Sequence, residues 1–432
     1  MRARRADMTK EGLPPYLFLT NVRELATIPL HFQKKAVEIM GKRQRLTALY
    51  ALVQASFWMS FCVAVSFAAV YLQSLGYDNT HLGVILAAGN LLGAVLGPAF
   101  SALIDRNPHA TASRLIPPLL AVQAAALALL LLFPRRGVLT ALSYVLYVAF
   151  SLSVNSLNLK LYVDFSHRGL PINYGVARGM GSLAYVLLSM GLGILAERTS
   201  IRALPMAGLA LCAMQAAAHV LLCRRLPAGQ AALTQQRQGV TLAAFLRKNR
   251  RFSLLLLGTA LLFFAHNTVC NFLINITRHV GGDTEDMGYI NSFMAAMEIP
   301  VMLLFSRLFG RRSTARLLRL AFCCFVLKTA AVAAAPSIPA LYAAFLLQAP
   351  SFALYTAAIV PYTERTVAYE DSAKAQSLAF SMTTLGSVLA SAVSGWMLDR
   401  LPVPHTLWIA CLACALGAGL ACFGVERKKT LQ

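Results

Sequence analysis

The sequence predicts an all-α membrane protein with twelve transmembrane helices in two pseudo-symmetric six-helix halves. Of its 432 residues, 58% are hydrophobic and only 13% are charged, a composition far from that of a soluble domain. Apolar runs of about 20 residues, the length that a helix needs to cross a bilayer, recur along the whole chain. The chain also repeats itself, because FSALIDR at 100–106 returns as FSRLFGR at 305–311, 205 residues later.

The first 46 residues are basic and only weakly apolar, and they lack the apolar region of a signal peptide. We interpret residues 1–46 as a cytoplasmic N-terminal extension. For residues 1–39 an alternative stays open, because MGKRQRL at 40–46 leads straight into the first span and looks like a usual bacterial opening. Met40 would then be the true start, and the intact mass of the native protein distinguishes the two alternatives.

Twelve apolar runs follow this extension, and each is too long for a strand. The predicted spans are 48–73, 82–104, 115–133, 138–159, 176–196, 203–223, 252–276, 287–307, 316–335, 338–360, 373–398 and 404–424.

The positive charges fall almost entirely on one side of these spans. The termini and loops of that side hold 32 of the 39 Lys and Arg residues, the opposite side holds 6, and Lys328 lies within a span. Because loops rich in Lys and Arg stay in the cytoplasm, we predict a multi-pass protein of the inner (plasma) membrane with both termini cytoplasmic. The net charge of +22 therefore reflects topology and contact with the lipid bilayer, and it predicts no nucleic-acid partner.

The repeat divides the chain into two halves. We predict an N-terminal half at 47–223, a basic cytoplasmic linker at 224–251, a C-terminal half at 252–425 and a cytoplasmic tail at 426–432. Within the linker, residues 241–251 can form an amphipathic helix along the inner membrane surface.

Two full charges lie deep inside predicted spans of the second half. Glu298 lies nine residues before Arg307, and Lys328 lies nine residues after Arg319, on either side of one basic turn. Each is about 14 Å from the turn and so near the middle of a hydrocarbon core about 30 Å thick. Charges at that depth face a partner or a wet cavity and mark a transport path. The structural alternative is an ion pair that only fixes helix packing.

Four spans carry polar or aromatic side chains at helical spacing. They are Tyr144, Tyr147, Ser151, Asn155, Asn158 and Tyr162 in span 4; His266, Asn267, Asn271 and Asn275 in span 7; Gln54 and Trp58 in span 1; and Gln348, Phe352, Tyr355 and Tyr362 in span 10. A polar face in a lipid-embedded helix needs a cavity, or else partner helices to which it hydrogen-bonds. His266 accordingly has two interpretations: a group that titrates in proton coupling, or a neutral hydrogen-bonded side chain.

Several segments together resemble one family. They are Tyr71-Leu…Gly76, Asp105-Arg106, NYGVARGMGS at 173–182, Glu298-Ile-Pro, SFAL at 351–354, AQSL at 375–378 and GWMLDR at 395–400. They are similar to the major facilitator superfamily, and within it to the branch that holds lactose permease and phenylpropionate-permease-like proteins. The chain differs from that branch at four places: Ser101 stands where Gly is usual, Pro108 where the family has no Pro, Gln348 where His is frequent, and Lys328 where Arg is usual.

The resemblance implies that spans 1, 4, 7 and 10 surround a central cavity. It also implies that Arg178 faces this cavity and holds substrate or a carboxylate; an Arg reaching to the inner membrane surface is the alternative. Spans 2, 5 and 11 would meet where the halves rock, which suits their small residues: Gly89, Gly93 and Gly97; Gly179, Ser182, Ser189 and Gly193; and Gly386, Ala390 and Ser394. Asp105 with Arg106 would help to latch the inner side, or would be a plain solvated pair.

We therefore expect a secondary active transporter of a small organic solute, working by proton-coupled symport and alternating access. Glu298 is the expected proton-responsive carboxylate, with Lys328 as its partner or as a ligand for an anionic solute. The expected hydrogen-bonding and stacking groups are Asn155, Asn158, Asn267, Asn271, Gln348, Trp58 and Tyr355. The solute could be a sugar, a nucleoside or an aromatic acid, and the excess of Lys328 and Arg178 over Glu298 favours an organic anion.

Two other functions stay open: proton-driven efflux of amphipathic compounds, and a transporter-like receptor that binds without moving solute. No enzyme motif is present in the sequence, so we expect neither an enzyme nor a cofactor or metal site. We expect the chain to work as a monomer.

Overall fold

The computed structural model describes residues 30–107, 110–168, 170, 172–225, 242–309, 312–368 and 371–426. Residues 1–29, most of the linker and the tail after Glu426 lie outside the described residues. The choice between Met1 and Met40 as the start therefore stays a prediction. The described helices are α2 (Leu30–Phe61), η4 (Cys62–Ser66), α3 (Ala68–Ser74), α4 (Asn79–Arg106), α5 (Ala112–Leu132), α6 (Val138–His167), α7 (Tyr174–Arg198), α8 (Ala203–Cys223), α9 (Leu242–Lys248), α10 (Arg250–Asn271), α11 (Leu273–His279), α12 (Thr284–Phe309), α13 (Thr314–Ala333), α14 (Ile338–Phe345), η5 (Leu346–Gln348), η6 (Ala349–Ala353), α15 (Leu354–Thr366), α16 (Ser372–Leu389), η8 (Ala390–Ser394), α17 (Gly395–Leu398) and α18 (Val403–Gly424).

These elements form the twelve predicted spans, so the all-α fold class is confirmed. Four spans are built from consecutive helical pieces: α2–η4–α3, α10–α11, α14–η5–η6–α15 and α16–η8–α17. Eleven helical stretches of the described chain are long and apolar enough to cross a membrane. The twelfth span is α13, which carries Arg316, Arg319 and Lys328 among its 20 residues.

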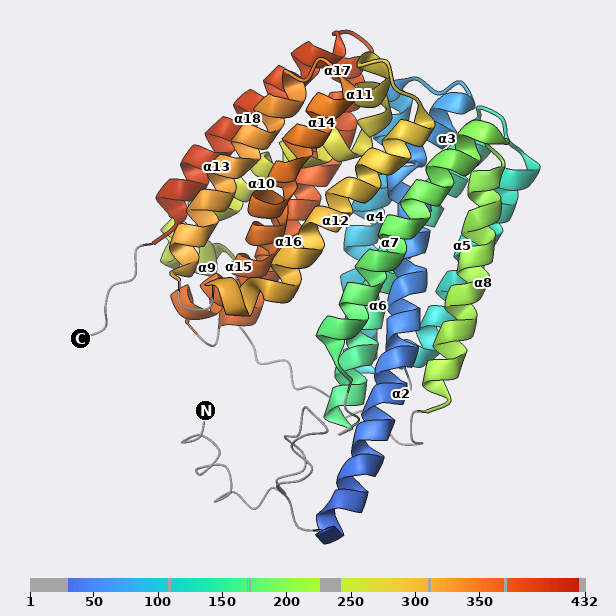
Figure 1. Ribbon diagram of the computed structural model, residues 1–432, viewed down its shortest axis with the longest axis vertical. Coiled ribbons are helices and arrows are strands. Elements are labelled where there is room, and N and C mark those ends of the chain that lie inside the picture. Colours follow the sequence, from blue (N-terminus) through green and yellow to red (C-terminus); the bar gives the residue numbers. More distant parts are fainter. Residues whose placement is uncertain are drawn as a thin grey trace.

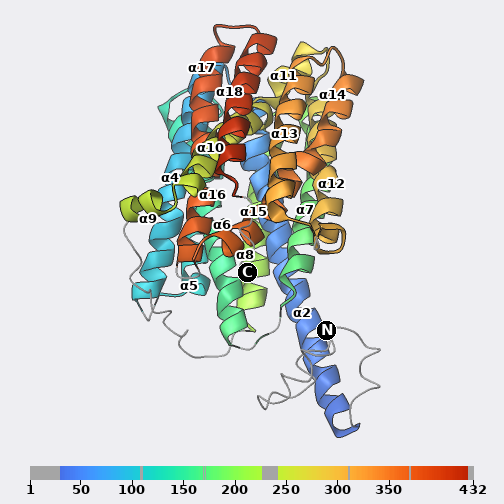
Figure 2. The ribbon, with the colours of Figure 1, turned by 90° about the vertical axis from the view of Figure 1, so that its left-hand side faces the viewer.

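The helices pack as two bundles, one made of α2–α8 and the other of α10–α18 (Figure 1). One cluster of buried apolar residues fills the first bundle and continues into α11, α12, α13 and α14, and a second lies within α9–α18. The short helix α9 lies crosswise to the long helices, beside the start of α10 (Figure 2). Helix α2 begins at Leu30, so the helix of the first span is continuous with the end of the N-terminal extension. The boundaries of the two halves stay a prediction.

The bundles contact one another mainly on one side of the molecule. We call this side the loop face; it holds the connections α3–α4, α11–α12 and α17–α18, and it is uppermost in Figure 1. There Asp399 accepts hydrogen bonds from Asn79 and Thr80, Gln73 donates to Asn275 at 2.8 Å, and Arg198 pairs with Glu285. On the opposite side, the terminal face, where α10 begins and α18 ends, the bundles diverge (Figure 1).

Small residues allow the closest approaches on the loop-face side. A Cβ added to Gly193 of α7 would lie 2.9 Å from the Cα of Gly288 in α12, and one added to Gly83 of α4 would collide with the carbonyl of Ser391 in η8. Spans 5 and 8, and spans 2 and 11, therefore meet backbone to backbone across the two bundles.

The longer small-residue rows on spans 2 and 11 pack elsewhere. Gly89, Gly93 and Gly97 lie against Val148, Leu152 and Ser156 of α6, and Gly386 lies against Ala260 and Phe263 of α10. These four glycines therefore contact helices of their own bundles, as the static-packing interpretation predicts. Spans 2 and 11 do meet between the halves, but their closest approach there is at Gly83 and Gly395 and not at these four glycines.

Candidate functional site

A cavity of about 260 Å³ lies between the two bundles. Spans 1 and 5 form one wall, and spans 7, 8 and 10 form the other. Its lining residues are Trp58, Phe61, Val65, Ser66, Arg178, Ser182, Tyr185, Phe263, His266, Asn267, Cys270, Asn271, Asn291, Met294, Ala295, Glu298, Gln348 and Phe352. Ten of these 18 residues are apolar or aromatic, with His266 counted as aromatic, and eight are polar or charged, so the lining offers a small molecule both apolar contacts and hydrogen bonds.

A continuous hydrogen-bonded chain runs along the second-bundle wall. Gln348 Nε2 donates to Glu298 Oε1 at 2.8 Å, and Gln348 Oε1 accepts from Lys328 Nζ at 2.9 Å. Lys328 Nζ also lies 3.0 Å from His266 Nδ1. Lys328 is the donor in this bond, because an ammonium group has three donors and no acceptor. The amide of Gln348 thus joins the two buried charges, and no direct ion pair between Glu298 and Lys328 is found in the described part of the chain.

Gln348 reaches this position because span 10 is irregular there. The helix tightens to a 3₁₀ turn at Leu346–Gln348 and widens to a π turn at Ala349–Ala353. Pro350 lies within the π turn and has no N–H for a helical hydrogen bond. Such interruptions are frequent at functional sites.

Aromatic rings surround the cationic end of the chain. Lys328 has no exposed surface, and its Nζ lies 5.0 Å from the centroid of the Phe325 ring. The ring of His266 stacks on that of Phe352, with centroids 4.6 Å apart. Lys328 itself does not line the cavity; Gln348 and His266 do, and they lie between it and the cavity. His266 accepts from an ammonium group, which fits the neutral hydrogen-bonded interpretation.

Arg178 supplies the cation of the first-bundle wall. Its guanidinium lies 3.9 Å from the centroid of the Trp58 ring, and its Nη1 donates to Ser182 Oγ at 2.8 Å. Trp58 Nε1 donates to Gln54 Oε1 at 3.3 Å, and Gln54 in turn donates to the hydroxyl of Tyr50. The resemblance implied that Arg178 faces the cavity, and in the structure it lines the cavity wall.

The two asparagines predicted in span 7 also line the cavity. Asn267 Nδ2 donates to the carbonyl of Phe263 at 2.8 Å, and Asn271 Nδ2 donates to Ser391 Oγ at 2.9 Å. The side-chain oxygens of both can accept hydrogen bonds from a bound solute.

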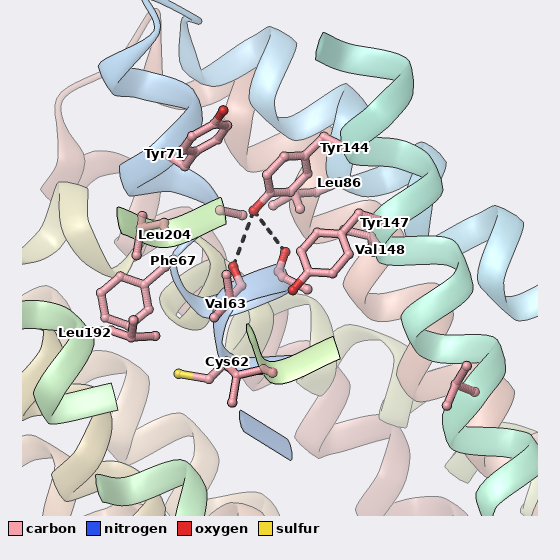
Figure 3. Packing of buried hydrophobic residues seen from close by; sticks show 14 of the residues in the cluster. Cys62, Val63, Phe67, Tyr71, Leu86, Tyr144, Tyr147, Val148, Leu192 and Leu204 are labelled. Carbon is pink, nitrogen blue, oxygen red and sulfur yellow. Dashed lines mark hydrogen bonds between the residues drawn. The ribbon is translucent and has the colours of Figure 1, made fainter. Parts of the chain in front are cut away.

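Span 4 contributes no residue to the cavity lining. Tyr144 donates to the carbonyls of Val63 and Ala64, at 3.5 and 3.1 Å (Figure 3), and Tyr147 donates to the carbonyl of Ser60 at 3.0 Å. These carbonyls lie in or just before the π turn η4, where regular helical bonding is interrupted. Tyr144 and Tyr147 of span 4 therefore bond to span 1 inside the first bundle.

Asn155 and Asn158 also lie outside the cavity lining. Asn158 is almost fully buried, and its backbone carbonyl accepts from the Tyr50 hydroxyl at 3.0 Å. Tyr355 is also outside: it lines a separate apolar pocket that adjoins the cavity. The structure thus corrects the expectation that these three residues face the central cavity.

The expected inner latch is paired within its own bundle. Asp105 Oδ1 accepts a hydrogen bond from Lys160 Nζ of α6, and Arg106 is exposed. In this conformation Asp105 therefore ties α4 to α6.

Sequence reasoning missed a polar network that closes the cavity toward the loop face. The hydroxyl of Tyr185 lies 2.6 Å from Ser66 Oγ and accepts from Asn291 Nδ2 at 2.9 Å, and Asn291 Nδ2 also donates to Ser189 Oγ at 2.8 Å. The network joins spans 1, 5 and 8 and therefore bridges the bundles. An Asn inside an apolar span was the available signal, because such a group needs a partner.

Comparison with known proteins agrees with this architecture. The profile of the MFS_1 like family matches residues 45–410. The chain is 30% identical to a maltose permease of Geobacillus stearothermophilus over 233 residues, which are 53% of this chain and 57% of that protein. It is 26% identical to a probable 3-phenylpropionic acid transporter of Escherichia coli (strain K12) over 322 residues, 73% of this chain and 82% of that protein. The match to the permease thus spans little more than half the length of that relative.

Solved structures share the fold. A crystal structure of the nucleoside transporter NupG superposes with a TM-score of 0.70 at 16% identity, covering 90% of this chain and all of that one. An inward-facing, unoccupied bacterial homologue of the human lysosomal transporter Spinster superposes with a TM-score of 0.67 at 12% identity, covering 89% and 97% of the two chains. The resemblance read from the sequence is confirmed, and the chain belongs to the MFS_1 like family of multi-pass membrane transporters in the major facilitator superfamily.

Proposed function

We propose that the protein is a proton-coupled symporter of a small organic anion, working by alternating access as a monomer in the inner (plasma) membrane with both termini cytoplasmic. The segments 47–223 and 252–425 are the two bodies that rock. The observation that carries this proposal is the chain Glu298–Gln348–Lys328, which joins a cavity-lining carboxylate to a buried ammonium group. With cytoplasmic termini, the described conformation is closed on the outside and diverges toward the cytoplasm.

The protonation state of Glu298 changes what the cavity presents to a solute. An ionised Glu298 places a negative charge beside the site and accepts from Gln348 through one oxygen. A protonated Glu298 keeps an oxygen for that bond and offers an O–H donor to the cavity. An anionic solute therefore binds better when Glu298 is protonated, and by linkage its binding favours protonation.

Arg178 and the span 7 asparagines complete the solute site. The Nη1 atom of Arg178 is bonded to Ser182, and its planar group is held against Trp58, so its remaining donors are pre-oriented. Lys328 lies behind Gln348 and keeps this amide in one orientation, with its N–H toward Glu298. The names of the permease and of the phenylpropionic acid transporter support a sugar or an organic acid as the solute class, and the cavity-lining Arg178 favours the acid.

Uptake into proteoliposomes tests this proposal. Because about 1.4 kcal/mol corresponds to a tenfold ratio, an inward gradient of one pH unit should drive about tenfold accumulation of the correct anion when one proton is carried with it. Glu298→Gln should abolish accumulation and leave solute exchange measurable. Unchanged accumulation in this variant would show that Glu298 does not carry the coupling.

The same assay separates the alternatives. Proton-driven efflux predicts accumulation only when the pH gradient is reversed. A receptor predicts binding with no flux under either gradient.

A further inference from the structure

A second, smaller pocket adjoins the central cavity in the second bundle. It has a volume of about 130 Å³ and lies among spans 7, 10 and 11. Its lining residues are Phe263, Phe352, Tyr355, Thr356, Ile359, Val360, Thr363, Gln376, Ala379, Phe380 and Thr383. Phe263 and Phe352 also line the central cavity, so the two spaces share an aromatic wall. We call this smaller space the side pocket.

Most polar side chains of the side pocket are bonded to the protein itself, whereas the buried hydroxyl of Tyr355 has no hydrogen-bond partner among the described residues. The hydroxyls of Thr356, Thr363 and Thr383 donate to carbonyls one turn earlier in their own helices, at 2.8, 2.8 and 2.7 Å. Gln376 Nε2 is directed at the Glu364 carboxylate, 3.5 Å away. These threonines therefore turn their donors away from an occupant, and the pocket favours an apolar group.

The size of the side pocket matches one ring. An apolar cavity of about 150 Å³ holds a benzene molecule in a well-studied engineered protein. At about 130 Å³, the side pocket has room for a single aromatic ring or an alkyl tail of a few carbons. A membrane lipid could place only the end of an acyl chain in it.

We propose that the side pocket receives the apolar tail of the transported anion, a single aryl ring or a short alkyl group, while its carboxylate lies in the central cavity near Arg178. This inference rests on the proposed function, because it takes the solute to be an organic anion. Phe263 and Phe352 are then the point where the polar and apolar parts of the solute meet. The central cavity holds the charged groups, and the side pocket sets the tail that is accepted.

Direct binding to the purified protein in nanodiscs tests which apolar tail the protein accepts. The probes are acetate, hexanoate, benzoate, phenylacetate, 3-phenylpropionate and 3-(2-naphthyl)propionate, measured by calorimetry without any pH gradient. Burying one ring should make the best phenyl-bearing acid bind roughly ten- to a hundredfold more tightly than acetate. The naphthyl acid should lose that gain, because its second ring exceeds the pocket. If no alkyl or aryl acid binds better than acetate, the proposal is wrong.

Variants in the side pocket test whether the apolar tail binds there. Ala379 is 4% exposed, and Ala379→Leu fills the space; the phenyl-to-acetate affinity ratio should fall at least fivefold while acetate affinity is kept. Val360→Ala enlarges the same space and should raise the affinity for the naphthyl acid. Ser377→Leu is the matched control, because Ser377 is exposed on the same helix and lies outside the pocket. An unchanged ratio in both pocket variants overturns the proposal.

Two further outcomes separate this proposal from others. If acid affinity depends on the tail and changes in the pocket variants, but no proton-driven uptake occurs, the proposed function is wrong and the side-pocket proposal is supported. If an anion is taken up with protons but its phenyl-to-acetate preference is unchanged by Ala379→Leu, the side-pocket proposal is wrong and the proposed function stands. Co-purified lipid that Ala379→Leu displaces, with no change in the acid series, identifies a lipid tail as the occupant and also overturns the proposal.

Discussion

The carboxylate of Asp399 accepts hydrogen bonds from the backbone N and the Oγ1 of Thr80, at 2.7 and 2.5 Å, across the two bundles. The same carboxylate accepts from the backbone N and Nδ2 of Asn79, at 3.0 and 2.9 Å. Both backbone donors belong to the first turn of α4, where N–H groups have no helical partner and a negative charge is favoured. A side chain of the second bundle therefore caps a helix of the first, and this contact holds the loop face closed.

Replacing Asp399 should open the loop face. Asp399→Asn loses the charge and one of its two acceptor oxygens, and a hydrogen bond to a charged group contributes about 1.5–3 kcal/mol. We expect the population open on that face to rise tenfold or more. The measurement is the rate at which a membrane-impermeant maleimide, added on the loop-face side, labels Ser66→Cys in a cysteine-depleted protein. Asp283→Asn is the control, because the Asp283 carboxylate accepts from the backbone N of Asp286 in its own bundle. Equal rates in both variants would contradict the prediction.

The Asp399 contact should be insensitive to pH in the working range. Burial opposes the charge of Asp399, but hydrogen bonds from Thr80 and Asn79 outweigh it and lower the pKa of Asp399 below its ordinary 3.8. A lowered pKa means that the stabilisation is present above pH 3.8 and is lost as the pH falls through the lowered value. The ratio of labelling rates between Asp399→Asn and the parent should therefore stay constant from about pH 7 to 5. A ratio that drops within this window would show that another group titrates at the contact.

The crossing of α7 and α12 should tolerate no side chain at Gly193. A Cβ there would lie 2.9 Å from the Cα of Gly288 and 3.0 Å from the carbonyl oxygen of Thr284, whereas a Cβ on Gly191 meets nothing within 4 Å. Gly193→Val should cost the closed loop face about 1–3 kcal/mol and speed the labelling of Ser66→Cys accordingly. Gly191→Val carries the same change in helix propensity on the same helix and should leave the rate unchanged. Similar rates for the two valine variants would rule out steric contact as the cause.

The amide of Gln348 should stabilise the folded protein, because it hydrogen-bonds to two charged side chains, Glu298 and Lys328. Gln348→Leu removes a donor from Glu298 and an acceptor from Lys328, and each buried group left without its partner costs about 1–3 kcal/mol. The thermal midpoint of the purified protein should fall. Adding Glu298→Gln should recover part of this loss, because a neutral amide needs the missing donor less. Strictly additive midpoints would show that Gln348 and Glu298 are not coupled.

Hydropathy and loop charge predict the twelve spans because lipid leaves the chain few choices. A span must be helical, about 20 residues long and nearly free of charge, and each of these conditions is visible in the sequence. The interruptions of the helices are less visible. Carbonyls in and just before the π turn η4 accept hydrogen bonds from the hydroxyls of Tyr144 and Tyr147, which come from a distant part of the chain.

The site could be predicted in part. The depth of Glu298 and Lys328 follows from counting residues along helices, and both belong to one hydrogen-bonded chain. Their bridge through Gln348 depends on the local unwinding of span 10, which residue spacing does not show. The polar face of span 4 illustrates the opposite case: spacing shows that Asn155 and Asn158 share a face, but it does not show which neighbour that face meets.

Lys328 has a consequence for how the protein is made. Helix α13 holds three basic residues, and a Lys near the centre of a span costs about 2.5–3.5 kcal/mol when the membrane-insertion machinery handles that span alone. The partners that receive Lys328 lie on other spans: His266 on α10, which is synthesised earlier, and Gln348 in η5, which is synthesised later. We therefore expect α13 to enter the bilayer together with its neighbours, so that the assembly of the second bundle waits for span 10 to leave the ribosome.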